Sequence, residues 1–164
     1  MIFVTVGTHE QPFDRLISAI DALKGEGIIR EDVIIQTGYS TYEPKHCTFS
    51  KLLPYSDMVK NVADARIVIT HGGPSSFIMP LQIGKIPVVV PRQEKYGEHI
   101  NDHQLMFALE VQERQKNILV VQDMDQLADM IIHYEEKVAQ LSGGYASNNE
   151  AFNRSFCELI NELF

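Results

Sequence analysis

The sequence predicts a single α/β domain, residues 1–164, built on a doubly wound parallel sheet. Three observations favour this class. Short runs of β-branched apolar residues alternate with segments that carry apolar residues at helical spacing. Most of these runs end in a polar turn that contains glycine, as expected where a buried strand leaves a sheet. The length of 164 residues suits one domain with a core of its own.

The first strand and helix are predicted near the start of the chain. Residues 2–6 form an apolar β-branched run, and the turn 7–9, Gly-Thr-His, follows directly. The next segment is a helix that ends at Gly25 and Gly27. Its buried face is formed by Phe13, Leu16, Ile17, Ile20 and Leu23.

The second and third strands are predicted in residues 32–37, which Gly38 closes, and in a short run at 46–49. A helix follows within residues 52–65. Met58 and Val62 lie on its inner face.

The centre of the chain is predicted as strand, turn, helix and strand. The strand 67–70 leads into His71-Gly72-Gly73, and Pro74 suits the first helical position, which makes Gly73 the N-cap. The helix ends near Gly84. Residues 88–90 are the next strand, parallel to the first because a helix crosses between them.

This turn has the features of a phosphate cradle. Gly72 and Gly73 allow close approach of an anion, the helix start supplies partial positive charge, and Ser75 and Ser76 add donors. The same residues also fit an ordinary strand-to-helix turn.

A second polar cluster follows residues 88–90. In a parallel sheet both clusters lie at the carboxyl ends of successive strands, the edge where ligands bind. The second cluster therefore predicts a sugar or nucleoside site, although the residues at 102–104 also suit a helix start with an Asp cap. Its polar residues are Arg92, Glu98, His99, Asn101, Asp102, His103 and Gln104.

The remaining elements continue the alternation. A helix is predicted at 102–115, a strand at 118–121, and a helix that Asp123 caps, with Gln126 at the capping-box position. The first of these helices would bury Leu105, Met106, Leu109 and Val111, with Phe107 as a further core candidate. The helix after Asp123 would bury Met124, Leu127, Met130, Ile131, Tyr134 and Val138. A final helix would pack Phe152, Phe156, Leu159, Ile160 and Leu163.

Composition narrows the classes of function. A formal net charge of −8 argues against a nucleic-acid surface, so a phosphate site has to be local. The two cysteines, Cys47 and Cys157, match no metal spacing and fit free thiols in a reducing compartment. No metal or cofactor is expected. No apolar run is long enough to span a membrane, and the strand at Met1 leaves no room for a signal peptide.

Three stretches resemble a known family: VGTHEQPFDRLI, THGGPSS and GKIPVVVPRQEKYGEHINDHQ. They are similar to the carboxyl-terminal, nucleotide-sugar-binding half of family 28 glycosyltransferases, in the same order and over essentially the whole chain. Within the family the resemblance is to bacterial capsule and exopolysaccharide β-1,4-galactosyltransferase-like subunits and to the catalytic subunit of the split eukaryotic UDP-N-acetylglucosamine transferase. The second domain of MurG is more remotely similar.

The resemblance implies the donor-binding half of a GT-B enzyme, in which two Rossmann-like domains face each other across a cleft. The implied partners are a membrane-anchored acceptor-binding subunit, a UDP-sugar as donor and a lipid diphosphate-linked saccharide. The implied reaction is an inverting, metal-independent transfer of galactose or N-acetylglucosamine. The protein would be cytoplasmic and recruited to the inner face of the cell membrane by its partner.

The resemblance also implies roles for single residues. The donor diphosphate would lie on His71, Gly72, Gly73, Ser75 and Ser76, and Gly7 and Thr8 would approach the nucleotide or sugar. The sugar and ribose would be held by Arg92, Glu98, His99, Asp102, His103 and Gln104.

One position departs from the family. Met79 stands where MurG-like domains carry a glutamate that binds the ribose, so Glu98 or Asp102 would replace it. The base that an inverting displacement needs would be His9, with His99 as the other candidate, because imidazole titrates near neutral pH. The partner is the third possible source of this base.

Two classes of function therefore remain open: a catalytic subunit, and a non-catalytic enhancer subunit, which Met79 would favour. A nucleotide-binding oxidoreductase is excluded, because GTHEQP lacks the G-x-G-x-x-G pattern. The carboxyl-terminal helix, with Phe152, Phe156 and Phe164, is the expected surface for a partner unless it packs back on the domain.

Overall fold

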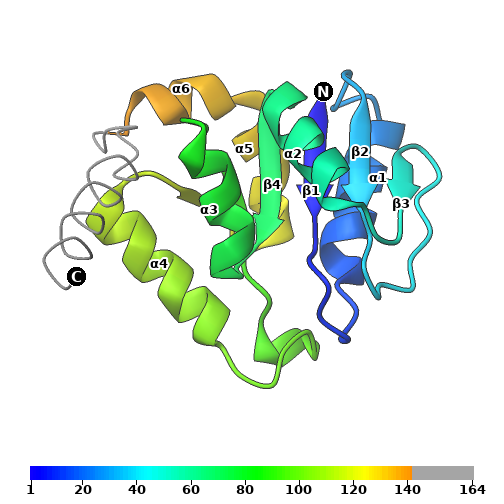
Figure 1. Ribbon diagram of the computed structural model, residues 1–164, viewed down its shortest axis with the longest axis horizontal. Helices are drawn as coiled ribbons and strands as arrows, with labels where there is room; N and C mark the ends of the chain where they lie inside the picture. The colour runs from blue at the N-terminus through cyan, green and yellow to red at the C-terminus, as the bar shows by residue number, and fades with distance from the viewer. Residues whose placement is uncertain (142–164) are drawn as a thin grey trace, which may run out of the picture.

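The computed structural model describes residues 1–141 (Figure 1). The final helix predicted from Phe152 onwards lies outside the described residues. The strands are β1 (Ile2–Thr5), β2 (Val33–Gln36), β3 (Thr48–Ser50), β4 (Ile67–His71), β5 (Val88–Val90) and β6 (Leu119–Val120). The helices are α1 (Asp14–Gly25), α2 (Tyr55–Asp64), α3 (Pro74–Gln82), α4 (His103–Gln115), α5 (Leu127–Ile132) and α6 (Tyr134–Ala139). Two 3₁₀ turns, η1 (Glu94–Tyr96) and η2 (Met124–Gln126), complete the described elements.

The six strands form one parallel sheet in the order β3-β2-β1-β4-β5-β6. The chain starts in the middle, at β1, moves outward through β2 and β3, and returns to pair β4 with the other side of β1. Ile2 is therefore opposite both Val33 and Ile67. This reversal between β1 and β4 is the topological switch point of a doubly wound fold. The predicted parallel α/β architecture is confirmed.

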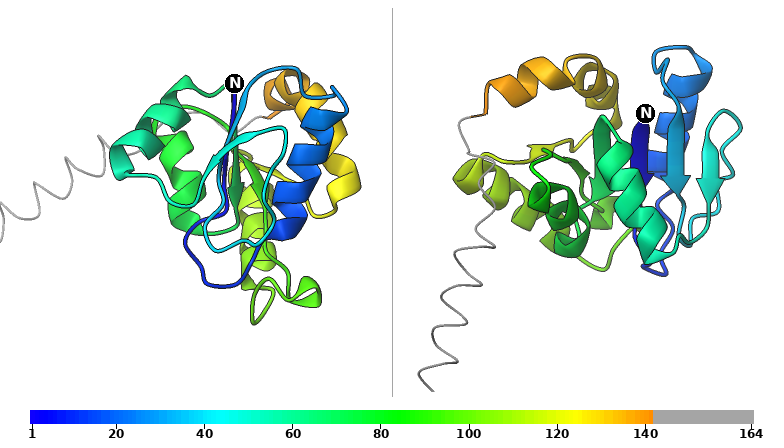
Figure 2. Two further views of the ribbon diagram at one scale, coloured as in Figure 1. Left: turned by 90° about the vertical axis from the view of Figure 1, so that its right-hand side faces the viewer. Right: turned by 45° about the horizontal axis from the view of Figure 1, so that its top comes forward.

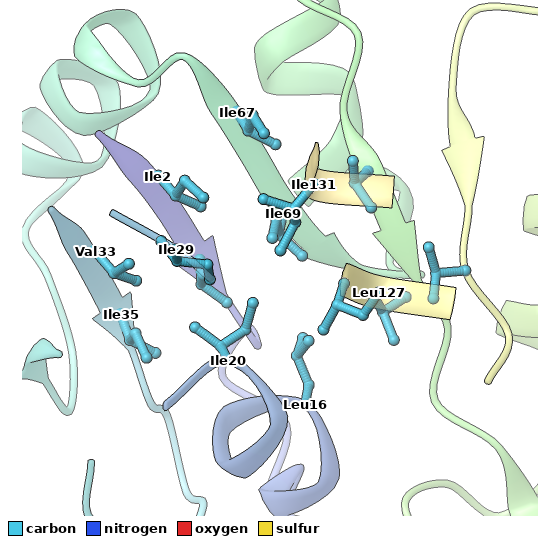
Figure 3. Packing of buried hydrophobic residues seen from close by; sticks show 14 of the residues in the cluster. Ile2, Leu16, Ile20, Ile29, Val33, Ile35, Ile67, Ile69, Leu127 and Ile131 are labelled. Carbon is cyan, nitrogen blue, oxygen red and sulfur yellow. The ribbon is translucent and has the colours of Figure 1, made fainter. Parts of the chain in front are cut away.

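Helices cover both faces of the sheet, because successive strand residues point to opposite sides (Figures 1 and 2). On one face, Ile2, Val4 and Ile69 pack against α1, α5 and α6 through residues such as Leu16, Ile20 and Leu127 (Figure 3). On the other face, Phe3 and Val68 pack against α2, and Val89 packs against α3 and α4. Strands buried on both faces need continuous apolar runs, which explains the β-branched segments of the sequence.

The last described helices differ from the prediction. The predicted single helix after Asp123 is divided into η2, α5 and α6, with a break at His133. The side chain of Asp123 makes no capping hydrogen bond, so the predicted capping box is not formed. The apolar stripe is nevertheless largely right, because Leu127, Ile131 and Tyr134 are buried.

The prediction for α4 was partly wrong. Met106 and Phe107 were expected in the core, but they are 68% and 42% exposed. The buried residue of α4 is Ala108, which contacts the cluster of Phe77, Val89 and Ile118. A small residue at this position lets the helix lie close to the sheet and turns the two larger side chains outward.

Candidate functional site

The candidate site lies at the carboxyl ends of β1, β4 and β5, around the switch point. Three loops meet there: residues 6–13 after β1, 72–73 before α3, and 91–102 before α4. This edge is where doubly wound sheets bind ligands. The predicted site residues come from all three loops and from the helix starts that follow them.

His71 is the last residue of β4 and is 9% exposed. Its Nδ1 accepts a hydrogen bond from the N–H of Gly73 at 2.9 Å. A neutral ring in this arrangement carries its hydrogen on Nε2, which lies 2.9 Å from Oγ of Ser76 and donates to it. The hydroxyl proton of Ser76 is then available for a ligand.

Burial, followed by the charge of Arg92, lowers the pKa of His71 to about 4, against an upward effect of Gln104. His71 is therefore neutral at pH 7 and organises the turn as a hydrogen-bonding residue.

The glycines of the cradle pack against protein side chains. A Cβ at Gly73 would lie 2.2 Å from Cε1 of His71, and a Cβ at Gly7 would lie 2.3 Å from its Nε2. A Cβ at Gly72 would lie 2.9 Å from Cβ of Gln104. The sequence argument assigns Gly72 and Gly73 to the approach of an anion, and the family resemblance assigns Gly7 to the approach of the nucleotide or sugar. The structure shows that they make room for His71 and Gln104, and that the N–H of Gly73 is already bonded to His71.

The donors that remain at this helix start belong to the serines. Gly73 is the N-cap and Pro74 the first residue of α3, as predicted. The N–H of Ser75 has no acceptor in the described part of the chain, and the Ser75 side chain is exposed. Together with the Ser76 hydroxyl and the helix dipole, it forms a compact set of donors for an anion.

His9 and His99 lie side by side, although they come from the first and third loops. Their ring centroids are 5.1 Å apart and the ring planes are tilted by 41°. Nδ1 of His9 accepts from the N–H of Gln11 at 3.2 Å, and Nδ1 of His99 lies 3.0 Å from Oδ1 of Asn101. Burial, then Arg92 and His99, lowers the pKa of His9, and Glu10 acts in the opposite direction.

Arg92 and Glu98 were predicted to touch the sugar, but the structure gives them other partners. Arg92 is fully buried, and its guanidinium donates to the carbonyl oxygens of Val6, Gln11, Pro12 and Glu98. Glu98 is 4% exposed and accepts two hydrogen bonds from Arg15, at 2.8 and 2.9 Å, and one from the N–H of Gln93. These residues join the first loop to the third. Glu98 is thus unsuited to replace the ribose-binding glutamate.

The remaining predicted residues lie around the start of α4. Asp102 is the N-cap residue of α4, but its Oδ1 accepts from the N–H of Glu94 rather than capping the helix. Gln104 is half-buried and its Oε1 accepts from the N–H of Arg92 at 3.3 Å. Thr8 and His103 are exposed.

A groove of about 470 Å³ runs between the start of α3 and α4. It is lined by Gly72, Pro74, His103, Gln104, Met106, Phe107 and Glu110. Sequence reasoning predicted three of these residues and missed the others, because Met106 and Phe107 were assigned to the core. Gln11 was also missed as part of the site, since its role follows only from its contact with His9. Asn101 was predicted as part of the polar cluster, but its contact with His99 was not.

Residues 1–141 contain neither a cluster of metal ligands nor a membrane-spanning helix. No group of three His, Cys, Asp or Glu side chains in this part of the chain could hold a metal ion. None of the helices between the first residue and Leu141 is long and apolar enough to cross a membrane.

Residues 1–123 match the glycosyltransferase family 28 C-terminal domain. The chain is 34% identical over 116 residues to the human "UDP-N-acetylglucosamine transferase subunit ALG13". This match covers 65% of the chain but only 10% of that protein.

One solved structure shares the fold. The glycotransferase of kitacinnamycin superposes with a TM-score of 0.54 at 14% identity, over 93% of this chain and 42% of that one. The glycosyltransferase SnogD from Streptomyces nogalater has a TM-score of 0.46 at 13% identity, over 88% of this chain and 40% of that one. The six-stranded parallel sheet matches the carboxyl-terminal half of GT-B glycosyltransferases. The chain belongs to the glycosyltransferase family 28 C-terminal domain family.

Proposed function

We propose that the chain is the catalytic, donor-binding subunit of a two-component inverting glycosyltransferase. It transfers a hexose, galactose or N-acetylglucosamine, from a UDP-sugar to a lipid-linked saccharide in exopolysaccharide or capsule biosynthesis. The observation that carries the proposal is the start of α3, where the Ser75 N–H and the two serine hydroxyls gather at the switch point of a family 28 domain.

The mechanism follows from where charge develops. The bond between the anomeric carbon and the diphosphate oxygen breaks, and negative charge builds on the diphosphate. Preorganised donors at the helix start stabilise that charge without a metal ion. His71 supports these donors, because its neutral ring holds both the Gly73 N–H and the Ser76 hydroxyl in place.

The acceptor half belongs to a second, membrane-anchored subunit. This proposal is supported by the human relative, which is named a subunit. We place the complex at the inner face of the cell membrane, with a lipid diphosphate-linked saccharide as acceptor. The carboxyl-terminal segment, with Phe152, Phe156 and Phe164, is the surface we assign to the partner.

A second candidate function is a non-catalytic subunit that stabilises a partner transferase. Met79 favours it, because an apolar side chain half-buried against Phe3 and Val68 cannot bind ribose hydroxyls as a glutamate would. The available serine donors favour the catalytic subunit, since a purely structural subunit has no need of an anion site.

The double variant Ser75→Ala with Ser76→Ala distinguishes the two. Transfer measured with the membrane subunit present should fall by a factor of about ten to a thousand, the range for losing donors to developing charge. Complex formation, followed by co-purification, should be unchanged. The matched control is Ser56→Ala, an exposed serine in the first turn of α2. Full transfer activity in the double variant would contradict the proposal that the start of α3 binds the donor diphosphate.

A further inference from the structure

The two neighbouring imidazoles differ in which ring nitrogen is open to a ligand. Nδ1 of His9 accepts from the backbone N–H of Gln11, and a backbone N–H can only donate. Neutral His9 therefore carries its hydrogen on Nε2. This nitrogen is a hydrogen-bond donor, and it has no lone pair with which to take a proton.

His99 has the opposite arrangement, which Asn101 determines. Oδ1 of Asn101 accepts from the backbone N–H of His103 at 3.2 Å, so the amide oxygen, not its nitrogen, faces this point. The same oxygen lies 3.0 Å from Nδ1 of His99, which must then be the N–H that donates. The lone pair of neutral His99 is on Nε2.

We propose that His99 is the general base of the transfer, that His9 donates a hydrogen bond to the ligand through Nε2, and that Asn101 positions His99. This assignment rests on the proposed function, and it reverses the order of candidates that the sequence suggests. The two rings are close enough to contact the same ligand, since their centroids are 5.1 Å apart. His99 is half-buried, and His9 beside it is more exposed.

The reaction balances with this assignment. An acceptor hydroxyl oxygen forms a bond to the anomeric carbon as the bond from that carbon to the diphosphate oxygen breaks. The bonding electron pair leaves with the UDP. The proton of the acceptor hydroxyl passes to Nε2 of His99, whose Nδ1–H remains bonded to Asn101, as in other base–orienter pairs.

The surrounding charges are consistent with these roles. Arg92 and His99 act on His9 to lower its pKa after the effect of burial, and Glu10 acts against them. His71, the third imidazole nearby, stays neutral because its pKa is about 4. Neutral His9 is the form in which Nε2–H donates and Nδ1 accepts from Gln11.

The first test needs no activity. Nitrogen-15 NMR of the full chain above pH 8 reports which ring nitrogen of each histidine bears hydrogen, with signals assigned by single substitutions. We expect hydrogen on Nε2 of His9 and on Nδ1 of His99. In Asn101→Ala, His99 should become a mixture of both forms while His9 is unchanged. Hydrogen on Nε2 of His99 in the unsubstituted protein would overturn the assignment, whatever the protein's function.

The second test measures transfer against pH with the membrane subunit present. His99→Ala should lower kcat by about 10²–10⁴ and remove the ionisation from the acidic limb of the profile, and added imidazole should restore part of the rate. His9→Gln, which keeps an N–H donor, should cost less than tenfold and keep that ionisation. His133→Gln, at the α5–α6 junction, is the control. Loss of the ionisation in His9→Gln but not in His99→Ala would overturn the proposal.

These two tests separate the inference from the proposed function. The NMR result can be as expected while UDP binds nowhere on the protein. In that case the proposed function fails, and the difference between the two rings remains a property of the fold.

Discussion

His71 shows how one residue organises the candidate site. The ring lies between Gly7 and Gly73. Its Nδ1 accepts a hydrogen bond from the N–H of Gly73, and its Nε2 is hydrogen-bonded to the hydroxyl of Ser76. Burial lowers the pKa of the ring to about 4, so His71 is uncharged at neutral pH. Any side chain at Gly73 would collide with it, although the φ of −74° at Gly73 suits every residue type. The glycine is required by packing, not by backbone conformation.

The burial of His71 makes the stability of the fold sensitive to acid. Its pKa is about 4 in the folded state and 6.5 when unperturbed, so between these values the unfolded chain binds more protons. The contribution of His71 to the free energy of unfolding is therefore complete above pH 6.5 and is lost as the pH falls from 6.5 to about 4. The difference corresponds to about 3 kcal/mol in the free energy of unfolding.

Denaturant unfolding at several pH values checks this prediction. His71→Asn, whose side-chain oxygen can still accept from the Gly73 N–H, should flatten the dependence between pH 4 and 6.5. His46→Asn, at an exposed histidine, should keep it. If the free energy of unfolding of His71→Asn still fell as steeply between pH 6.5 and 4, a group other than His71 would be the cause of the pH dependence.

Residue types and their order predicted which side chains gather at the carboxyl edge, but not what each contacts. Arg92 and Glu98 show the difficulty. A polar cluster indicates hydrogen-bonding capacity, and that capacity can be used by a ligand or by the protein itself. Here the guanidinium of Arg92 satisfies four backbone carbonyls from two loops, an arrangement that depends on the tertiary fold.

Among the elements, α1 does more than cover the sheet. Two of its aspartates hold the loop after β2 against the helix. Asp14 accepts from the N–H groups of Thr41 and Tyr42, at 2.8 and 2.9 Å. Asp21, only 1% exposed, accepts from the N–H groups of Lys45 and His46 and from the hydroxyl of Tyr42.

Asp21→Asn tests this attachment. Burial alone raises the pKa of Asp21, but the hydrogen bonds from Lys45, His46 and Tyr42 lower it below its ordinary value, so the carboxylate is stabilising above that value. The variant replaces one acceptor oxygen by a donor that faces N–H groups. We expect a loss of about 2–3 kcal/mol in the free energy of unfolding at pH 7.

The loss should shrink as the pH falls through the lowered pKa of Asp21, because the unsubstituted carboxyl then becomes protonated. Asp32→Asn, at an exposed aspartate, is the control. Equal stability of Asp21→Asn and the unsubstituted protein at pH 7 would contradict the attachment.

The spacing of apolar residues predicted which segments are helical, but it was less accurate for the residues at which the helices begin and end. The stripe from Leu127 to Tyr134 is buried as expected, yet the segment is broken at His133, where the hydroxyl of Tyr134 lies close to the carbonyl of Ile86. Likewise, the spacing of α4 could not tell whether Met106 or Ala108 faces the sheet. The orientation of α4 depends on the space between α3 and α4, and this space exists only in the folded protein.

For the whole molecule, the order of strands determines where chemistry can occur. Because β1 and β4 are neighbours, the first loop and the start of α3 meet, although Thr8 and Gly73 are 65 positions apart in the sequence. The alternation of strands and helices predicted a doubly wound parallel sheet, but not the order of its strands, which the fold alone shows. A single sheet of this kind forms one wall of a two-domain GT-B cleft.

The central claim, that this wall binds a nucleotide diphosphate through the start of α3, is tested most directly by calorimetric titration of the full chain. UDP and its galactose, glucose and N-acetylglucosamine conjugates are added in the presence of a metal chelator. We predict saturable binding that is lost in Ser75→Ala with Ser76→Ala and kept in Ser56→Ala. Absence of binding in the unsubstituted protein, even with its membrane partner added, would contradict the claim and favour the non-catalytic subunit.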